Sequence, residues 1–240
     1  MVKRDAFFPH VPSYLKWVSP VNSFGADSSI PGSLRSSCPI ALAQPVQTGS
    51  ILLMSFESPT CFEKIGMRVE WTLSGPLIAP YLRGLKLRGD EVLLEVGCGG
   101  GAVTKQLSRL LPRGRVVGVD PSAYWVEYAR RRLRRLRNVA LHAGDVLTAD
   151  IDPETFDAVL FHYVLHDIAA SDRPTTLGHV YELLKEDGRL FLREPTKESH
   201  GVSLPEIRPL TGSAGFREER FRERKAMLFG SSFEGTFRKA

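Results

Sequence analysis

Residues 91–102 read EVLLEVGCGGGA, and this stretch decides the fold class. The apolar run from Glu91 to Val96 predicts a buried strand that ends in a glycine-rich turn. Glycines permit a tight turn and let the backbone approach a ligand closely. A helix is predicted from Ala102 to Leu111, so its free N–H groups can face an anion or a carboxylate. A strand–turn–helix unit without any ligand is the structural alternative.

Strands and helices alternate after this unit. Further strands are predicted at Arg115–Val119, Val139–His142, Ala158–Phe161 and Arg189–Arg193, and helices at Ala123–Leu136 and Arg173–Leu184. Strands spaced by helices predict an α/β fold with a parallel sheet and right-handed crossovers. The residues from Glu218 to Phe229 and from Phe233 to Arg238 predict a closing β-hairpin. Upstream, helices are predicted over residues 61–73 and from Ser74-Gly75-Pro76 to Gly84.

The amino-terminal part has a different character. Seven of the sixteen prolines fall within the first sixty residues, and no helical or strand period is sustained there. We therefore expect a weakly ordered arm over residues 1–57 and one domain over residues 58–240. The abrupt change near Met54 also raises the hypothesis that Met54 is the natural start. Peptides from upstream of Met54 in the native protein would contradict that hypothesis.

Composition indicates an ordinary globular protein, with 42% apolar and 25% charged residues in a chain of 240. No apolar run approaches the roughly 18 residues that span a bilayer. Pro9 and Pro12 interrupt any secretory signal, and three cysteines form no framework, which predicts a reducing, cytoplasmic setting. The net charge is +5, and six arginines lie within residues 130–137, so the basic excess is local.

Acidic residues follow two of the predicted strands. Asp120 ends the second strand, where a carboxylate can accept hydrogen bonds from ribose hydroxyls; an ordinary helix cap before Pro121 is the alternative. Gly97-x-Gly99-x-x-Ala102 also satisfies the pattern of NAD-binding folds. Three features favour another nucleoside cofactor. Glu95 is placed to reach a cationic amino group, Asp145 is placed to accept from an adenine amine, and the closing hairpin is foreign to an all-parallel sheet.

These residues together resemble class I S-adenosylmethionine-dependent methyltransferases, and specifically the small-molecule group that includes the quinone methylases. Glu95 to Gly101 match the family's first motif, E/D-x-G-x-G-x-G, in full. Asp120 matches the acidic residue of the second motif, and Asp145 matches the third. Residues 156–166, FDAVLFHYVLH, resemble the fourth motif, in which FD-x-V is followed by Leu-His.

Two further segments carry the resemblance to the end of the chain. Residues 183–190, LLKEDGRL, resemble the family's LKPGG turn, with Glu186 and Asp187 in place of its proline and first glycine. Ala214-Gly215-Phe216 resembles the element that enters the last two strands. The resemblance covers about residues 65–240. It implies a Rossmann-like three-layer sandwich with a mostly parallel seven-stranded sheet and an antiparallel C-terminal β-hairpin.

The resemblance also implies cofactor roles. Glu95 would face the amino-acid end of S-adenosylmethionine, Asp120 would hold the ribose, and Asp145 would frame the adenine. The product would be S-adenosylhomocysteine. The implied cofactor-contacting residues are Glu95, Gly97, Cys98, Gly99, Gly101, Asp120, Pro121, Asp145, Val146, Phe161 and His162.

Catalytic groups are harder to identify from the sequence. His162 and His166 are four residues apart, so a helical turn would present both on one side, and histidine has a pKa suited to removing a proton. Glu194 follows the fifth strand, at the edge where α/β sites lie. The candidate catalytic residues are therefore His166, His162 and Glu194. For His166, a purely structural role as a polar residue at the start of a helix is an equal alternative. The two histidines could also suggest a metal site, but no third ligand is apparent near them in the sequence, so a metal site is not expected.

Several functions stay open at this stage. We expect a methyltransferase with a small-molecule acceptor, whose pocket would come from residues 61–82 and 195–214. The arginine run is either a solvated helix face or a phosphate-binding patch for RNA, which would favour an RNA or protein methyltransferase. A non-catalytic cofactor-binding protein is a third possibility. Trp71 and Tyr124 are aromatic candidates near the cofactor, but such residues are more often core.

Overall fold

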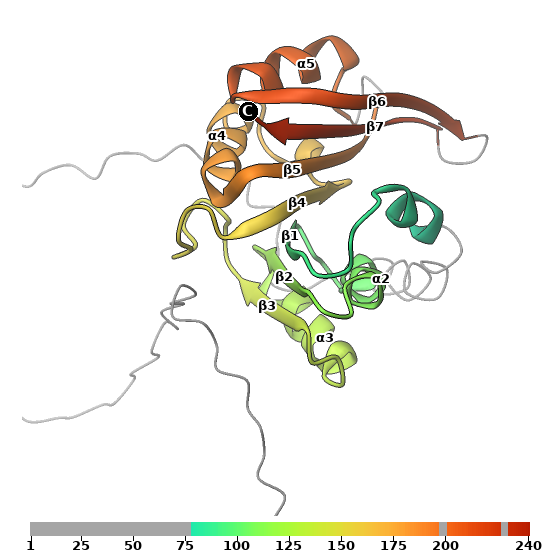
Figure 1. The fold of residues 1–240 in the computed structure, drawn as a ribbon, viewed down its shortest axis with the longest axis vertical. Helices are drawn as coiled ribbons and strands as arrows, with labels where there is room; N and C mark the ends of the chain where they lie inside the picture. Colours follow the sequence, from blue (N-terminus) through green and yellow to red (C-terminus); the bar gives the residue numbers. More distant parts are fainter. Residues whose placement is uncertain (1–77, 197–200, 227–229) are drawn as a thin grey trace, which may run out of the picture.

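A seven-stranded sheet organises the described part of the chain, which in this computed structural model comprises residues 78–196, 201–226 and 230–240 (Figure 1). The strands are β1 (Val92–Val96), β2 (Arg115–Asp120), β3 (Val139–Ala143), β4 (Phe156–His162), β5 (Leu184–Pro195), β6 (Phe216–Ala226) and β7 (Gly230–Lys239). Their order across the sheet is β3-β2-β1-β4-β5-β7-β6. The first five are parallel, and β7 pairs antiparallel with both β5 and β6. The predicted fold class is confirmed.

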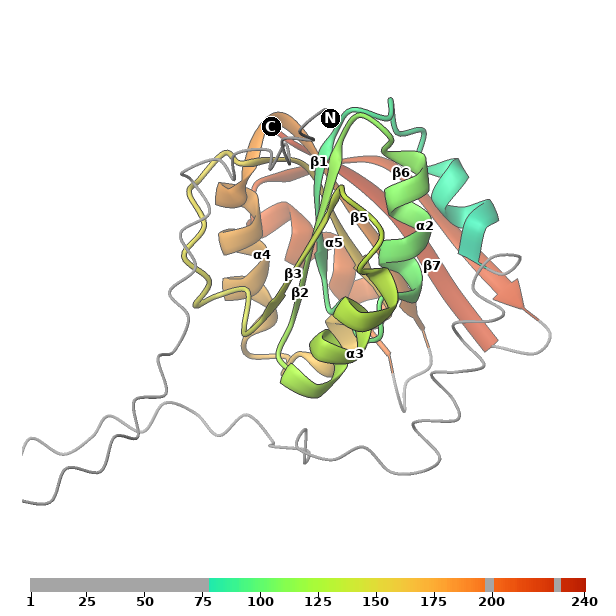
Figure 2. The same ribbon diagram turned by 90° about the horizontal axis from the view of Figure 1, so that it is seen from below.

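Helices cover both faces of this sheet. They are α2 (Ala102–Leu110), α3 (Ala123–Leu133), α4 (Arg173–Leu183) and α5 (Leu204–Ser213), and residues 78–84 are also helical. Figure 2 shows α2 and α3 on one side of the sheet and α4 on the other. The alternation along each strand explains the two layers: Leu94 and Val96 pack in the core of the α4 face, whereas Leu93 packs with Leu107 of α2.

Two element ends differ from the sequence-based expectation in ways that bear on the function. α3 ends at Leu133, not Leu136, because the chain turns there and the N–H of Leu136 donates to the carbonyl of Leu133. Only three of the six clustered arginines are therefore helical. β5 begins at Leu184, directly after α4, and not at Arg189. Its register with β4 shifts between Leu184 and Arg189, and Asp187 within this irregularity has a φ of +60°.

Helix α5 was not predicted from the sequence, and it lies in the segment assigned to the acceptor pocket. Two prolines and a glycine lie within its bounds, and these residues argue against a helix on propensity alone. Burial of Ile207 and Leu210 in the core of the α4 face stabilises it nonetheless. The predicted arm over residues 1–57, the helix over 61–73, the helix start at 74–76, Met54 and Trp71 lie outside the described residues.

The order of the strands creates the place where a ligand can bind. β1 lies between β2 and β4. From β1 the chain first adds β2 and β3 on one side, and it then crosses back to add β4 on the other side of β1. In open α/β sheets the crevice at such a switch point, outside the carboxyl ends of the strands, is the usual ligand site. Here the glycine turn leaves the end of β1, beside the end of β4.

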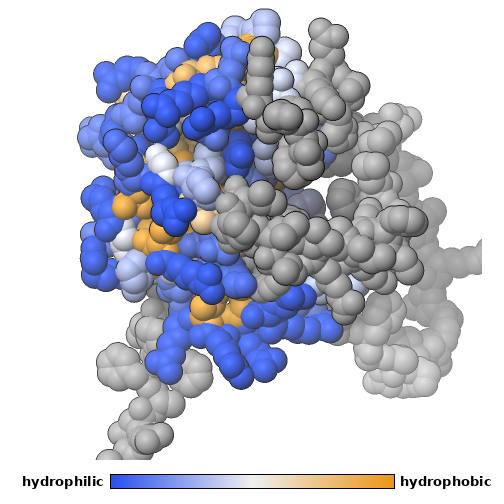
Figure 3. All heavy atoms as spheres, turned by 90° about the vertical axis from the view of Figure 1, so that its right-hand side faces the viewer, coloured by the Kyte–Doolittle hydropathy of each residue, from blue (hydrophilic) through white to orange (hydrophobic). Residues whose placement is uncertain are grey.

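The described surface shows no sign of a membrane-spanning element. Over residues 78–196, 201–226 and 230–240, no helix is both long enough and apolar enough to cross a bilayer. On the side seen in Figure 3, the coloured surface is mostly hydrophilic, and hydrophobic residues appear as small separate patches.

Candidate cofactor and acceptor site

The glycine turn has a backbone that other residues could not adopt. Gly97, Gly99 and Gly101 have φ values of +71°, +47° and +79°, in the left-handed region that side chains disfavour. A Cβ atom on Gly97 would lie 2.4 Å from a methyl group of Val164, and one on Gly101 would lie 2.8 Å from Leu133. The turn is therefore glycine-rich for two reasons, its dihedral angles and its contact with neighbouring segments.

Asp120 joins the glycine turn to the start of α3. Its Oδ2 accepts a hydrogen bond from the N–H of Gly99 at 2.8 Å, and its Oδ1 accepts one from the N–H of Ser122 at 2.9 Å. Ser122, and not Asp120, is the residue whose side chain caps α3. Burial raises the pKa of Asp120. Each carboxylate oxygen has a second lone pair, so this carboxylate fits the recognition of a pair of hydroxyls.

Glu95 is buried beneath the turn, on the α2 face of the sheet. Its Oε2 accepts a hydrogen bond from the hydroxyl of Thr104 at 2.6 Å, which fixes the first turn of α2 to β1. This end of the turn therefore combines a negative carboxylate with the partial positive charge of a helix N-terminus. Such a pair suits a group that carries both an amino and a carboxylate charge. Contact between Glu95 and a cationic amino group stays a prediction.

The other predicted cofactor residues surround the same edge in different ways. The carboxylate of Asp145 accepts a hydrogen bond from the N–H of Leu147 at 2.9 Å, and the N–H of Gly144 donates to the carbonyl of Asp120. The loop after β3 is thus tied to the end of β2. Val146 and Phe161 are buried in the core of the α4 face, so Phe161 offers the site its backbone more readily than its ring.

Cys98 and Pro121 flank the turn on the α3 side. Cys98 is buried against Val126 and Ala129 of α3, and burial raises the pKa of its thiol. Pro121 is exposed between Asp120 and the cap of α3. Cys98 therefore acts as a small packing residue, as the sequence indicated, while Pro121 borders the open side of the turn.

Glu194 is the centre of a hydrogen-bonded group at the ends of β4 and β5. Its side chain is fully buried, and its Oε1 accepts hydrogen bonds from the N–H groups of Val164 and Leu165 at 2.9 and 2.8 Å. Its Oε2 lies 2.7 Å from Nδ1 of His166, and this contact raises the pKa of the imidazole. Two of the three candidate catalytic residues are thus brought together.

The expected helical turn carrying both histidines does not form. A bend at Tyr163, with φ of +59°, separates β4 from a short 3-10 helix over Leu165–Asp167. His162 instead packs against the rings of Tyr81 and Tyr163, and burial together with Arg193 lowers its pKa to about 3. The two imidazoles have different partners because His162 belongs to the strand and His166 to the turn after it.

Comparison with known proteins identifies this arrangement. Residues 93–188 match the model of a methyltransferase domain family. Over this segment, which holds the glycine turn and Asp120, the chain resembles methyltransferase domains. A demethylmenaquinone methyltransferase of Symbiobacterium thermophilum is 32% identical over 113 residues, which are 45% of this chain and 44% of that protein. A 2-phytyl-1,4-naphtoquinone methyltransferase of Thermosynechococcus vestitus is 33% identical over 106 residues, 44% of this chain and 46% of that protein.

A solved structure shows the same fold over more of the chain. The magnesium protoporphyrin IX methyltransferase of Synechocystis, crystallised with bound S-adenosylmethionine, superimposes with a TM-score of 0.58. The match covers 76% of this chain and 86% of that one at 19% identity, which supports the fold alone. The chain spans less than half the length of the two quinone methyltransferases it matches.

A cavity of about 330 Å³ lies at the opposite edge of the sheet, near the amino ends of β1, β4 and β5. Lys86, Arg88, Asp157 and Asp187 are among the residues of both charge signs that line it. Ligands of open α/β sheets bind at the carboxyl ends of the strands. We therefore do not assign the cofactor to this cavity.

The sequence analysis did not single out Arg193, and it included Tyr81 only as part of the expected acceptor segment over residues 61–82. The guanidinium of Arg193 lies over the ring of Tyr81, with its Cζ 4.7 Å from the ring centroid. Tyr81 comes from the helix over residues 78–84, and Arg193 comes from β5. A charged residue two positions after the buried Phe191, inside an apolar strand, was the available signal.

The pair of His166 and Glu194 predicts a pH-dependent stability. The folded pKa of His166 exceeds the unfolded value of about 6.5, so the pair stabilises the fold most below that pH. This stabilisation is lost as the pH rises through the raised pKa. We expect the melting temperature of the wild type, relative to His166→Gln, to be highest near pH 5.5 and to fall towards about pH 9.

Thermal denaturation of both proteins across this pH range measures the effect. The lowered pKa values of His162 and His142, about 3 and about 4, destabilise both proteins equally in acid and cancel in the difference. A difference in melting temperature that does not change with pH would contradict the assigned pairing.

Proposed function

We propose that this protein transfers the methyl group of S-adenosylmethionine to a small-molecule acceptor. The carboxylate of Asp120, hydrogen-bonded to the glycine turn and to the start of α3, is the observation that carries the proposal. A carboxylate in this position can accept hydrogen bonds from a pair of ribose hydroxyls, and it lies beside a turn whose glycines allow a ligand to come close to the backbone. When bound, the cofactor supplies an activated sulfonium methyl group, so the protein has to position the partners and exclude water.

The residues of the chain fit the parts of this cofactor. Gly97, Gly99 and Gly101 allow the backbone to come close, and Glu95 lies under the turn to balance a cationic amino group. Asp145 and Val146 belong to the loop tied to Asp120, which suits an adenine ring. Pro121 and the backbone at Phe161 and His162 border the remaining sides. Cys98 packs behind the turn.

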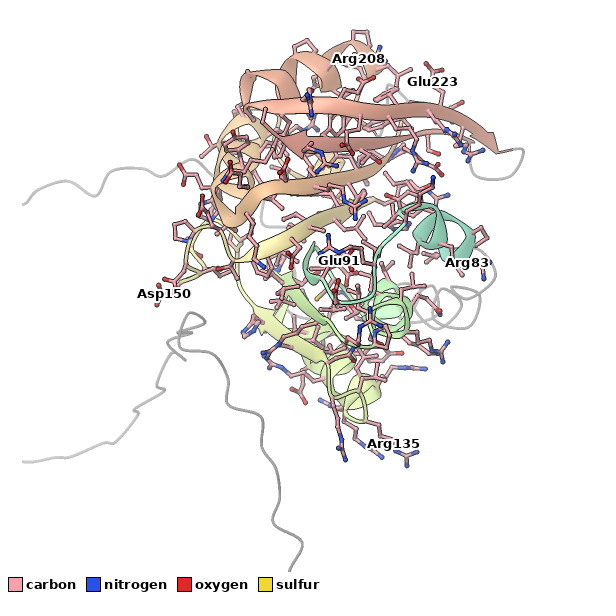
Figure 4. All side chains as sticks on the ribbon, viewed as in Figure 1. Arg83, Glu91, Arg135, Asp150, Arg208 and Glu223 are labelled. Atoms are coloured by element: carbon pink, nitrogen blue, oxygen red, sulfur yellow. The ribbon has the colours of Figure 1, made fainter. Side chains whose placement is uncertain are left out.

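Several observations support a small acceptor over a macromolecular one. Two quinone methyltransferases are among the proteins to which this chain is similar. The clustered arginines lie in the last turn of α3 and in the turn that follows it. Figure 4 shows Arg135 pointing outward at the lower end of the molecule. Arg131 pairs with Glu127 of its own helix at 3.1 Å. A solvated helix end accounts for this cluster.

We further propose that Glu194 and His166 hold the chain segment after β4 in place and that a proton can be accepted there. Glu194 is a positioning residue, because it contacts two backbone N–H groups and one imidazole and is itself fully buried. His166 accepts a proton more readily than a free histidine, since its pKa is raised. His162, with its lowered pKa, stays neutral at pH 7 and serves as a packing and hydrogen-bonding group.

Calorimetric titration with S-adenosylmethionine tests the central proposal. We expect micromolar binding to the wild type, and a loss of about 1–3 kcal/mol in Asp120→Ala, which corresponds to roughly 5- to 150-fold. Asp120→Asn, which keeps one carbonyl acceptor, should lose less. Asp150→Ala removes an exposed carboxylate elsewhere and serves as the matched control.

Titration with NAD in parallel separates the two nucleoside cofactors. Clear preference for NAD, or no binding of S-adenosylmethionine by a folded wild type, would overturn the proposal. Binding of the cofactor without methyl transfer across a broad panel of phenols, quinols and carboxylic acids would instead favour a non-catalytic role. Electrophoretic retardation of RNA at moderate salt would point to a macromolecular acceptor.

A further inference from the structure

Two buried polar atoms near the ends of β4 and β5 have no hydrogen-bond partner among the described residues. They are the hydroxyl of Tyr81 and Nε of Arg193. Buried polar groups are nearly always paired with protein or water, and leaving one unpaired costs about 1–3 kcal/mol. They occur together at the carboxyl ends of β4 and β5, where they can donate to a group that the described residues do not supply.

Aromatic rings frame the guanidinium of Arg193. The Cζ atom lies 4.7 Å from the ring centroid of Tyr81 and 5.4 Å from that of Tyr163. Nη1 lies 3.4 Å from Nε2 of His162. We call Tyr81, His162, Tyr163, Arg193 and Glu234 the Arg193 subsite. Contacts with two rings restrict the orientation of the guanidinium, which suits it to directed recognition of an oxygen pair.

The charge of Arg193 is only partly balanced by the carboxylates around it. Glu234 is the nearest carboxylate, with Oε1 3.8 Å from Nε of Arg193, and its Oε2 also lies 3.3 Å from Nε of Arg224. One carboxylate is therefore shared by two arginines. Glu194 does not compensate this charge, because it lies on the opposite face of the sheet, where its oxygens are engaged by the segment after β4.

The subsite lies on the face of the sheet where the cofactor turn leads into α2. Tyr81 and Phe191 pack in the same core as Val103 and Leu107 of α2, and Arg193 is two residues beyond Phe191 on that face. Val96 pairs with Phe161, and the next residue of β4, His162, pairs with Arg193. The backbone of Arg193 is thus two strand spacings, roughly 10 Å, from the glycine turn.

We propose that the Arg193 subsite binds an anionic oxygen, a carboxylate or an ionised phenol or enol, on a planar acceptor. The guanidinium donates to this oxygen, the hydroxyl of Tyr81 supplies a second donor, and the ring of Tyr163 contacts the plane of the acceptor. This proposal rests on the proposed methyl transfer and specifies its substrate class. It also gives a reason for the strained backbone at Tyr163, which brings that ring beside the guanidinium.

A matched pair of fluorinated probes tests the proposal without knowledge of the natural acceptor. 4-Fluorobenzoate carries the anionic oxygens, and 4-fluorobenzamide has the same shape without the charge. Fluorine NMR line broadening reports weak binding of each to the full chain saturated with S-adenosylhomocysteine. We expect the wild type to prefer the benzoate by about tenfold or more, since a hydrogen bond to a charged group contributes about 1.5–3 kcal/mol.

Three variants assign that preference to its source. Arg193→Met should abolish the preference, and Tyr81→Phe should reduce the affinity for benzoate about five- to tenfold. Arg135→Met removes the same charge from an exposed position beyond α3 and should have no effect. The affinity for S-adenosylhomocysteine should be unchanged in all three variants, which also shows that they are folded.

The outcomes separate this proposal from the proposed function. Equal binding of both probes, no binding of either by the wild type, or a preference retained in Arg193→Met overturns the subsite while leaving cofactor binding intact. Failure of S-adenosylhomocysteine to bind the wild type overturns the proposed function, and the probe preference can still be measured in that protein. A carboxylate source and a phenolate source are distinguished by repeating the comparison with 4-fluoro-2-nitrophenolate and its methyl ether.

Discussion

Replacing Glu194 with alanine is expected to lower the free energy of unfolding by about 3–5 kcal/mol. Glu194 is fully buried and accepts hydrogen bonds from Val164 and Leu165 while contacting His166. Alanine leaves two N–H groups and one imidazole without their acceptor, in a place that water does not reach. Chemical denaturation monitored by circular dichroism measures the loss.

Glu194→Gln is the matched control for the effect of charge. Glutamine keeps one oxygen for the two backbone N–H groups, so we expect a smaller loss of about 1–2 kcal/mol. The pH dependence assigned to His166 should also weaken in this variant, because the carboxylate that raises its pKa is gone. A loss below about 1 kcal/mol in the alanine variant would show that the group around Glu194 does not hold the segment after β4.

Gly97→Ala is expected to destabilise the fold by about 2–4 kcal/mol and to weaken binding of S-adenosylmethionine at least tenfold. The φ of +71° is unfavourable for alanine, and the added Cβ would lie 2.4 Å from Val164. Either the turn or the segment after β4 has to move, and both border the cofactor site. Denaturation and calorimetry on the same preparation measure the two effects.

A double-mutant cycle with Val164→Ala separates the two causes. Removing the valine methyl groups relieves the contact but not the unfavourable dihedral angle. We therefore expect the double variant to regain the part of the loss due to the contact, with a favourable coupling energy of about 1–2 kcal/mol. Additive effects of the two substitutions would mean that the turn and the segment after β4 adjust independently.

Local patterns were sufficient for the part of the molecule that surrounds the glycine turn. The strand before Gly97 and the helix after Gly101 follow from an apolar run, glycines and a helical period in consecutive residues. The position of Asp120 follows from the length of one strand–helix–strand unit. The closing hairpin was visible because Phe233 and Phe237 alternate with polar residues, and both are buried in the structure.

The contacts of the acceptor region could not be predicted in the same way. Glu194 and His166 are 28 residues apart in sequence, and only the register of β4 and β5 brings them together. The bend at Tyr163 separates the two histidines, and no residue type at that position indicates a positive φ. The subsite around Arg193 combines three strands and one helix, and α5 forms by burial against its own propensity.

The insertion of β7 between β5 and β6 has a consequence for synthesis of the protein. β6 leaves the ribosome before β7, yet among the described strands β6 pairs only with β7. The five parallel strands can therefore assemble during translation, while β6 has to wait with its edge unpaired until residues 230–239 emerge. Such a waiting strand is open to association with other chains. We expect the pairing of β6 to complete the sheet last, so that substitutions in β7 that weaken this pairing leave β6 open to association and increase the need for chaperones.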